Sequence, residues 1–238
     1  MKHRLAEFQN QTEGQTVLET LAWALKTFGA PDLVLASSMG AEDQMLTHYL
    51  LGLEPKARVF TLDTGRHFQE TYDLMAATER AYNFRYESYF PEASDVEELL
   101  AAQGANGFYR SVAARQACCR VRKVLPLQRA LAGAKAWITG QRREQGLTRT
   151  SLERVEWDAG NGLFKINPLV DWTEATLWEA LGSAKVPTHA LHAHSYPSIG
   201  CQPCTRAVAP GEDLRSGRWW WEEPEHKECG LHHRPQTA

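Results

Sequence analysis

Five cysteines carry most of the chemistry that this sequence could perform. They form an adjacent pair, Cys118 and Cys119, a C-x-x-C pair, Cys201 and Cys204, and a single Cys229 close to the last residue. Four thiols in two pairs are the donor set of a metal centre or an iron-sulfur cluster, whereas a fifth near a chain end is typical of a mobile nucleophile. We therefore expect the first four cysteines to act as ligands and Cys229 to be reactive.

The C-x-x-C segment has a competing interpretation as a thioredoxin-like redox dithiol. Such a dithiol places its first cysteine at the start of a sustained helix, but Pro210 and Gly211 interrupt the chain soon after Cys204. Gly200 and Pro203 suit a tight metal-binding turn, so the sequence favours ligation. Independent buried cysteines are the alternative for all four thiols.

The adjacent pair is too strained for an ordinary intramolecular disulfide, but both thiols could bind one centre. If the segment is helical, Lys123 lies four residues after Cys119 on the same face and brings its ammonium toward the thiolates. Zinc and iron-sulfur clusters both accept four thiolates. Adjacent ligands depart from the usual zinc spacing, which favours a cluster.

Basic residues follow and precede Cys229. Lys227, His232 and His233 could lower the pKa of its thiol. A disordered end with an unreactive thiol, or a Cys/His metal site, is the alternative.

Three segments, 37–43, 62–66 and 138–144, place small, polar and cationic residues after predicted strands. Helix-start N–H groups and paired guanidinium groups both suit phosphate or sulfate. None of the segments contains a Walker A or dinucleotide-binding motif. The carboxyl ends of parallel strands are where such sheets bind ligands, so we expect an anion site there, with ordinary capped turns as the alternative. The candidate residues are Ser37, Ser38, Gly40, Asp63, Gly65, Arg66, Gly140, Arg142 and Arg143.

Composition limits the classes of partner. The chain has 238 residues, 43% of them hydrophobic, and a formal net charge of only −3, so we expect neither nucleic-acid nor membrane binding. Residues 110–154 carry eleven basic and two acidic side chains, which favours a small polyanionic ligand. An apolar leader and a bilayer-length span are missing from the sequence, and an odd number of cysteines suits a reducing compartment. We therefore expect a cytoplasmic protein.

Short apolar runs alternate with helical patterns. We expect strands at 32–36, 58–63, 84–90, 135–140 and 164–167, and helices at 16–28, 41–51, 67–82, 94–103, 113–131 and 173–181. Pro126 should kink or break the fifth helix, and Asp171, three residues before Glu174, should cap the last. The pattern predicts an α/β fold with a mostly parallel sheet and helices on both faces. We expect a nucleotide-binding domain over 1–184 and an irregular segment over 185–238.

Six ordered motifs together resemble one family. Six segments of the chain are similar to motifs of the assimilatory adenylyl-sulfate reductases. They are Ser-Ser-Met-Gly-Ala-Glu-Asp (37–43), Leu-Asp-Thr-Gly-Arg (62–66), Cys-Cys-Arg-Val-Arg-Lys (118–123), Ile-Thr-Gly-Gln-Arg-Arg-Glu (138–144), Cys-Gln-Pro-Cys (201–204) and Lys-Glu-Cys-Gly-Leu-His (227–232). Those enzymes belong to the phosphoadenylyl-sulfate reductases, whose fold is similar to that of the PP-loop ATP pyrophosphatases. The first motif departs from the PP-loop pattern, so ATP hydrolysis is not expected.

The resemblance implies one [4Fe-4S] cluster on Cys118, Cys119, Cys201 and Cys204. It implies that Cys229 attacks the sulfur of adenylyl sulfate and that a thioredoxin or glutaredoxin-type dithiol releases sulfite. The three strand-end segments would surround the nucleotide, and Lys123 would lie near the cluster and the sulfate. Further positions that the resemblance assigns to the substrate are Arg215, Arg218 and His232. A homo-oligomer is left open.

Two alternatives stay open at this point. The substrate could be the 3′-phosphorylated nucleotide, although relatives specific for it generally lack the two cysteine pairs. The chain could instead be a zinc-stabilised binding module with Cys229, His232 and His233 as a second metal site.

Overall fold

The computed structural model describes residues 2–145 and 151–223. Contacts divide the chain into two compact units whose segments alternate along the sequence. The first unit comprises Met1–Thr61, Glu70–Glu87 and Leu131–Ala190, and the second comprises Leu62–Gln69, Ser88–Ala130 and Leu191–Ala238. The domain division expected from the sequence, at 184/185, stays a prediction. That boundary lies near the last of the five passages between the units, and the sequence reasoning predicted none of the four earlier ones.

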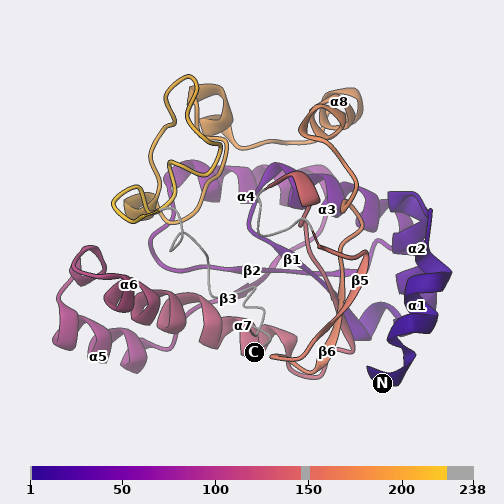
Figure 1. Cartoon of the computed structure of the whole chain (residues 1–238), viewed down its shortest axis with the longest axis horizontal. Helices are drawn as coiled ribbons and strands as arrows, with labels where there is room; N and C mark the ends of the chain where they lie inside the picture. Colours follow the sequence, from indigo (N-terminus) through magenta and orange to yellow (C-terminus); the bar gives the residue numbers. More distant parts are fainter. Residues whose placement is uncertain (1, 146–150, 224–238) are drawn as a thin grey trace. The chain divides into compact units, whose positions relative to one another are not determined.

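Helices and strands alternate along most of the chain (Figure 1). The helices are α1 Leu5–Thr12, α2 Val17–Phe28, α3 Ala41–Leu53, α4 Gln69–Tyr82, α5 Ala93–Gln103, α6 Val112–Cys119, α7 Leu125–Leu131 and α8 Glu174–Ala184. The strands are β1 Leu33–Ser37, β2 Arg58–Leu62, β3 Glu87–Tyr89, β4 Ala136–Ile138, β5 Val155–Asp158 and β6 Leu163–Ile166. The sequence did not predict α1 or β5.

The six strands form one sheet in the order β3-β2-β1-β4-β6-β5. Strand β1 pairs in parallel with both β2 and β4, β4 pairs in parallel with β6, and β5 pairs antiparallel with β6. The expected mostly parallel α/β fold is therefore confirmed. After β1 the chain adds strands on one side, and it returns with β4 on the other side. The carboxyl ends of β1 and β4 thus form the point at which the strand order reverses, which is where sheets of this class bind ligands.

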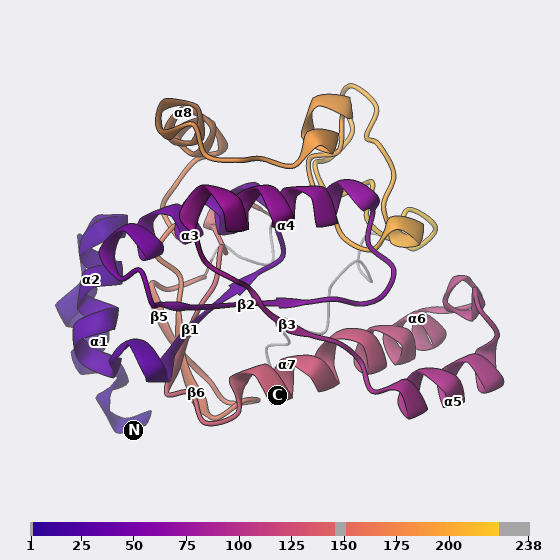
Figure 2. The ribbon, with the colours of Figure 1, turned by 180° about the vertical axis from the view of Figure 1, so that it is seen from behind.

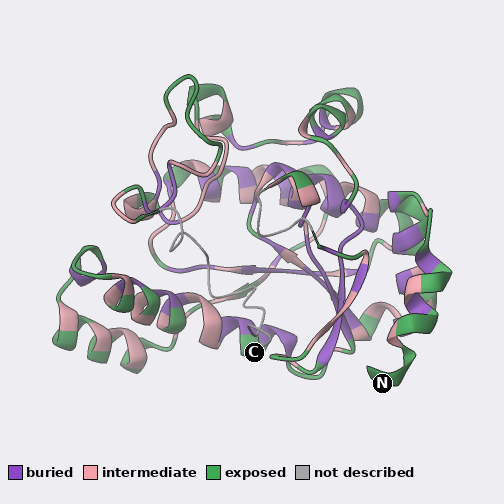
Figure 3. Ribbon diagram, viewed as in Figure 1, coloured by how far each residue is buried: buried purple, intermediate pink, exposed green. Residues whose placement is uncertain are grey.

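The core of the first unit lies between this sheet and its helices. Leu33, Leu35, Ile138 and Ile166 are at most 1% exposed, and the strands are largely buried in Figure 3. In both Figure 1 and Figure 2, α3 and α4 lie together on one side of the strands, with α8 beyond them. Leu177 of α8 packs with Met45 of α3 in a separate apolar cluster.

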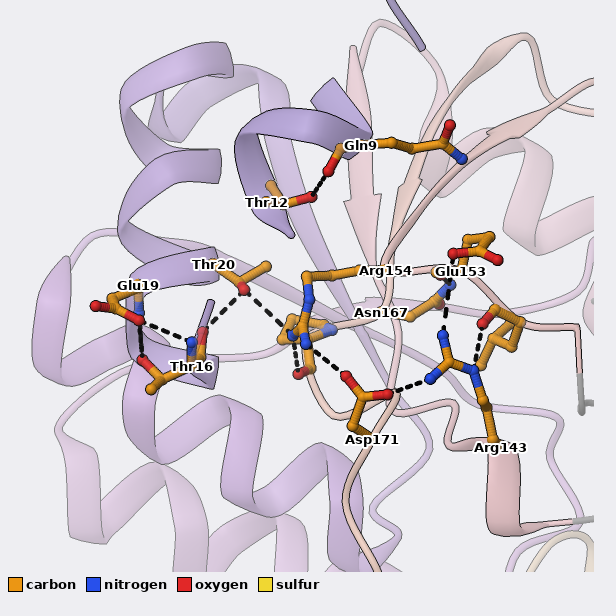
Figure 4. A network of polar contacts seen from close by, with 12 residues as sticks. Gln9, Thr12, Thr16, Glu19, Thr20, Arg143, Glu153, Arg154, Asn167 and Asp171 are labelled. Atoms are coloured by element: carbon orange, nitrogen blue, oxygen red, sulfur yellow. Dashed lines mark hydrogen bonds and ion pairs between the residues drawn. The ribbon is translucent and has the colours of Figure 1, made fainter. Parts of the chain in front are cut away.

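Local capping explains where two helices begin. Thr16 caps α2, accepting a hydrogen bond from the N–H of Glu19, whose carboxylate accepts from Thr16 in return. Helix α8 is capped by Thr173, so the predicted cap at Asp171 is wrong. The Asp171 carboxylate instead pairs with the guanidinium groups of Arg143 and Arg154, which leaves it unable to cap the helix (Figure 4).

The second unit contains α5 and α6, which lie side by side in both ribbon views. Pro126 does not break the helix, because the chain stays helical from α6 through a π-helical segment, Arg120–Val124, into α7, and the alternative of a kink there stays a prediction. Proline has no N–H to donate to the preceding turn, which interrupts the regular ladder. From residue 190 onward the described chain is irregular, with two short 3-10 turns, Ala190–His194 and Gln202–Cys204, and an antiparallel bridge between Thr205 and Arg218.

Within the described ranges, the structure holds no helix that is both long and apolar enough to cross a membrane.

Candidate functional site

The loop after β1 is built around Asp43 of the first unit. Both the N–H and the Oγ of Ser38 donate to Asp43 Oδ2 at 2.7 Å. Met39, which follows, has φ of 62°, and Gly40 precedes the first turn of α3. The loop is therefore closed onto the helix start, and the predicted residues Ser37, Ser38 and Gly40 lie at the carboxyl end of β1.

The loop after β4 packs against the same helix start. A methyl group on Gly140 would lie 2.5 Å from Asp43 Oδ1 and 2.7 Å from Glu42 Cβ, so only glycine fits there. Burial raises the pKa of Asp43 to about 6, although hydrogen bonds from Ser38 and Gly140 work against that rise. The two loops at the reversal point thus form one packed structure with a buried carboxyl group at its centre.

The paired arginines after β4 are occupied by acidic partners. Arg142 is 4% exposed and pairs with Glu42 and Glu144, each at 3.0 Å. The Arg143 guanidinium pairs with Asp171 and donates to the carbonyl of Leu152 at 2.8 Å (Figure 4). Their predicted role in binding a nucleotide stays a prediction. In the described residues both side chains already make ion pairs.

Four cysteines of the second unit line one cavity. Cys118, Cys119, Cys201 and Cys204 all contribute to its wall, and the cavity is partly open to solvent. The remaining lining residues are Arg66, Phe108, Arg115, Arg122, Lys123, Pro203 and Trp219. The structure therefore brings together the two cysteine pairs that the sequence predicted to share one centre.

Helical spacing explains how the adjacent cysteines both face this cavity. The lining residues from α6 and the π-helical segment are Arg115, Cys118, Cys119, Arg122 and Lys123, which recur at intervals of three or four. That spacing lines up one face of a helix. Short π-helical segments often occur at functional sites, and this one begins directly after Cys119.

Polar groups contact the cysteine pairs at close range. The Thr64 hydroxyl lies 3.2 Å from Cys201 Sγ, and Arg122 Nη1 donates to the Thr64 carbonyl at 2.6 Å. Arg122 Nε is buried and has no hydrogen-bond partner among the described residues. A buried guanidinium N–H beside thiols is a donor suited to a thiolate or a sulfide.

Two of the thiols, those of Cys118 and Cys204, are not activated for nucleophilic attack. Burial raises the pKa of Cys118, and burial together with the nearby Cys201 raises the pKa of Cys204 to about 12. A reactive cysteine has a lowered pKa, whereas ligation deprotonates a thiol through the metal itself. The cavity therefore suits ligands better than nucleophiles.

The donor set fits an iron-sulfur cluster. Four thiols and several cations around one cavity match the charge and the ligand number of a cluster held by four thiolates. Nowhere in the described parts of the chain do three Cys, His, Asp or Glu side chains converge closely enough to hold one ion. Thiolates of a cluster bind different iron atoms and need not converge on a single point.

The predicted turn at 62–66 also belongs to the second unit. Asp63 Oδ1 accepts a hydrogen bond from the Gly65 N–H at 2.8 Å, and Gly65 has φ of 69°. Arg66 donates to the carbonyl of Ala105 at 2.6 Å and lies over the ring of Phe108. Asp63 and Gly65 therefore shape a tight turn, while Arg66 lines the cysteine cavity.

The remaining predicted cations lie in the same unit. Lys123 lines the cavity, and both Lys123 and Arg218 act electrostatically on Cys204. Arg218 is 8% exposed. Arg215 is half-buried in the loop before it, and its carbonyl accepts from the Arg218 N–H at 2.9 Å.

Comparison with known proteins decides the family. The model of the phosphoadenosine phosphosulfate reductase domain matches residues 32–207. The chain belongs to the phosphoadenosine phosphosulfate reductase family. An adenosine 5′-phosphosulfate reductase of Allochromatium vinosum is 54% identical over 202 residues, which cover 85% of this chain and 79% of that protein.

Solved structures agree with this assignment. A phosphoadenylyl-sulfate reductase from Candida auris has a TM-score of 0.74 and 26% identity, with 87% of this chain and 98% of that chain covered. Yeast FAD synthetase shares the fold alone, with a TM-score of 0.55 and 11% identity over 87% of this chain and 75% of that chain. The predicted resemblance to this reductase family and its fold is therefore confirmed.

Four predicted residues, Lys227, Cys229, His232 and His233, lie outside the described residues. The sequence reasoning missed Asp43, Thr64, Arg115 and Arg122. The two arginines could have been found from helical spacing, because each lies three residues from a member of the adjacent cysteine pair. Thr64 and Asp43 lie inside the predicted motifs. The contacts that give them a role form only in the folded chain, so no pattern in the sequence indicates them.

Proposed function

We propose that this chain reduces adenylyl sulfate to sulfite and AMP in sulfate assimilation, with electrons from a protein dithiol in the cytoplasm. The observation that carries the proposal is the cavity lined by two cysteine pairs and by cations in the second unit. Curated relatives named adenosine 5′-phosphosulfate reductase support the choice of substrate.

The first step would be a displacement at sulfur. The Cys229 thiolate attacks the sulfonyl sulfur, a new S–S bond forms, and the bond from sulfur to the bridging phosphate oxygen breaks. AMP leaves with that electron pair, and Cys229 carries an S-sulfonate. Attack on a group that already bears negative oxygens requires nearby cations. Lys123, Arg215 and Arg218 are proposed to supply them.

The second step would transfer two electrons. One thiolate of a thioredoxin or glutaredoxin-type protein attacks the Cys229 sulfur and displaces sulfite, which keeps the electron pair of the broken S–S bond. The second thiol of that protein then closes its own disulfide and regenerates Cys229. The dithiol is oxidised, and sulfur passes from the sulfate to the sulfite level.

We propose that Cys118, Cys119, Cys201 and Cys204 hold one [4Fe-4S] cluster. When bound, the cluster would supply structural and electrostatic support without a change of redox state, because the dithiol already delivers both electrons. Arg122 and Thr64 would donate hydrogen bonds toward its cysteine sulfurs.

The loops at the reversal point are proposed to bind the nucleotide. Ser37, Ser38, Gly40 and Gly140 present backbone at the carboxyl ends of β1 and β4, and the start of α3 favours anionic oxygens. The same proposal includes contacts of the nucleotide with Asp63, Gly65 and Arg66. It also includes contacts of the nucleotide with Arg142, Arg143 and His232.

The second candidate substrate is the 3′-phosphorylated nucleotide, because the matched structure from Candida auris is a reductase of that compound. Sulfite and AMP release from adenylyl sulfate, with thioredoxin as reductant and anaerobically purified protein, tests the proposal. We expect turnover of adenylyl sulfate at least tenfold faster than that of the 3′-phosphorylated form. No sulfite from adenylyl sulfate, or a preference for the phosphorylated form, would contradict it.

A further inference from the structure

The guanidinium of Arg218 packs directly against the backbone of Gly200, within the second unit. A methyl group built on Gly200 would lie 2.3 Å from Arg218 Nη2, 2.7 Å from Cζ and 3.2 Å from Nη1. Ordinary van der Waals contact begins at 3.4 Å. The planar group therefore fills the space that any side chain at position 200 would need.

Neighbouring groups hold the guanidinium in that place. Nη1 donates to Ser198 Oγ and to the Ile199 carbonyl, each at 3.3 Å. The indole ring of Trp219 has its centroid 4.9 Å from Arg218 Cζ, within the range of a cation–π contact. Arg218 is thus fixed by contacts on the residues directly before Cys201.

Backbone pairing connects the same two segments. Thr205 and Arg218 form an antiparallel bridge. The Trp219 N–H donates to the Cys204 carbonyl at 3.1 Å, and the Arg206 N–H donates to the Gly217 carbonyl at 3.0 Å. The position of Arg218 is therefore defined relative to the C-x-x-C turn, whose Cys204 thiol it influences electrostatically.

We propose that Gly200 is a positioning residue for Arg218, because its missing side chain gives the guanidinium a fixed place beside the cysteine cavity. Conformational freedom is not the reason for glycine here, since Gly200 is not among the residues with positive φ. The inference rests on the proposed function, in which Arg218 meets the anionic groups of adenylyl sulfate. It assigns a role to a residue that does not itself touch the substrate.

Alanine at position 200 separates this role from folding. The atoms it would meet belong to the end of a flexible side chain and not to the backbone, so the fold accommodates the methyl group while the cation moves. The required shift is about 1 Å, the difference between 2.3 Å and ordinary contact. A displacement of that size at a reacting site costs up to about 100-fold in rate.

The test compares kcat/KM for adenylyl sulfate in four variants of the cofactor-loaded enzyme. We expect Gly200→Ala to lower kcat/KM by about 10- to 100-fold with iron content unchanged. Gly182→Ala is the matched control, because a methyl group there meets nothing within 4 Å. Arg218→Lys should also lower kcat/KM, and Gly200→Ala should add little to it, since both changes remove the same placed guanidinium.

Different results would separate the possible failures. Multiplicative losses in the double variant, wild-type activity of Gly200→Ala, or loss of iron from Gly200→Ala would overturn the positioning role. An Arg218→Lys enzyme as active as the native one would also refute the proposed role of Arg218 itself. A crystal structure of Gly200→Ala gives a readout independent of turnover. We expect a displaced guanidinium on an unchanged backbone, and an undisplaced one would refute the inference.

Discussion

The ion pair between Arg115 and Glu222 should be one of the strongest single contributions to stability in the second unit. Its side chains are 1% and 3% exposed, and its two hydrogen bonds, Nε to Oε1 and Nη2 to Oε2, measure 3.0 and 2.7 Å. Burial works to lower the pKa of Arg115, but the bonds with Glu222 hold that pKa above its usual range. Glu222 is therefore the carboxylate that compensates the buried charge of Arg115.

Removing the Glu222 charge leaves the buried guanidinium of Arg115 without its carboxylate partner. Glu222→Gln keeps the shape of the side chain but loses the carboxylate, so the free energy of unfolding should fall by about 3–5 kcal/mol. Glu7→Gln is the matched control, because the Arg4–Glu7 pair has the same chemistry with both side chains 46% exposed. Its unfolding should be indistinguishable from that of the native protein.

Urea unfolding followed by far-UV circular dichroism, on samples of equal iron content, measures this difference. With an m-value of about 2–3 kcal/mol per molar urea, the expected loss moves the midpoint down by roughly 1–2.5 M. The double variant Arg115→Met/Glu222→Gln removes both charges and should be more stable than the sum of the single variants. Additive losses, or a Glu222→Gln midpoint equal to that of Glu7→Gln, would refute the reasoning.

Three further predictions follow from the described contacts. Because burial raises the pKa of Asp43 to about 6, the folded state holds a proton that the unfolded state loses between about pH 4 and 6. Stability should therefore fall as pH rises through that window by about 3 kcal/mol. Urea midpoints at several pH values should show this fall in the native protein and not in Asp43→Asn, and equal slopes would contradict it. Gly140→Ala should weaken AMP binding at least tenfold by calorimetry, because its methyl group meets Asp43. Gly52→Ala is the control and should bind AMP normally, because a methyl group there meets nothing within 4 Å. Equal affinities of the two variants would count against a nucleotide site at these loops. Cys204→Ser should lower iron and sulfide content and the visible absorption, and a full iron complement would exclude this thiol as a ligand.

The sequence predicted the sheet because its signals are local. The apolar runs that became β1, β2, β4 and β6 stand between turn residues and helical patterns, and each lies within a few residues of its expected place. Strand β5 was not predicted because Val155–Asp158 offers only four residues of apolar and polar alternation and pairs only as an edge of the sheet. The sequence predicted helix α8 at the right place but with the wrong cap. Asp171 forms ion pairs with Arg143 and Arg154, which only folding brings near it.

The candidate site likewise has features that the sequence predicts and features that it does not. The shared cavity of the four cysteines could be inferred from residue type and pairing, because four thiols in two pairs are a typical donor set of a metal centre. The pairing of Arg142 with Glu42 and the fit of Gly200 against Arg218 could not be predicted, because each depends on a contact between residues that only folding brings together. The alternation of the two units could not be predicted either, because no local signal in the sequence marks residues 62–69 as part of the second unit.

The central claim is that one cysteine makes the bond to sulfur while four others serve as ligands. Mixing the enzyme with adenylyl sulfate in the absence of any dithiol, followed by peptide mass spectrometry, tests it most directly. The account predicts one S-sulfonate on Cys229, discharged as sulfite when thioredoxin is added, and none on a Cys229→Ser enzyme. An adduct that persists in Cys229→Ser, or AMP release without any adduct in the native enzyme, would contradict it.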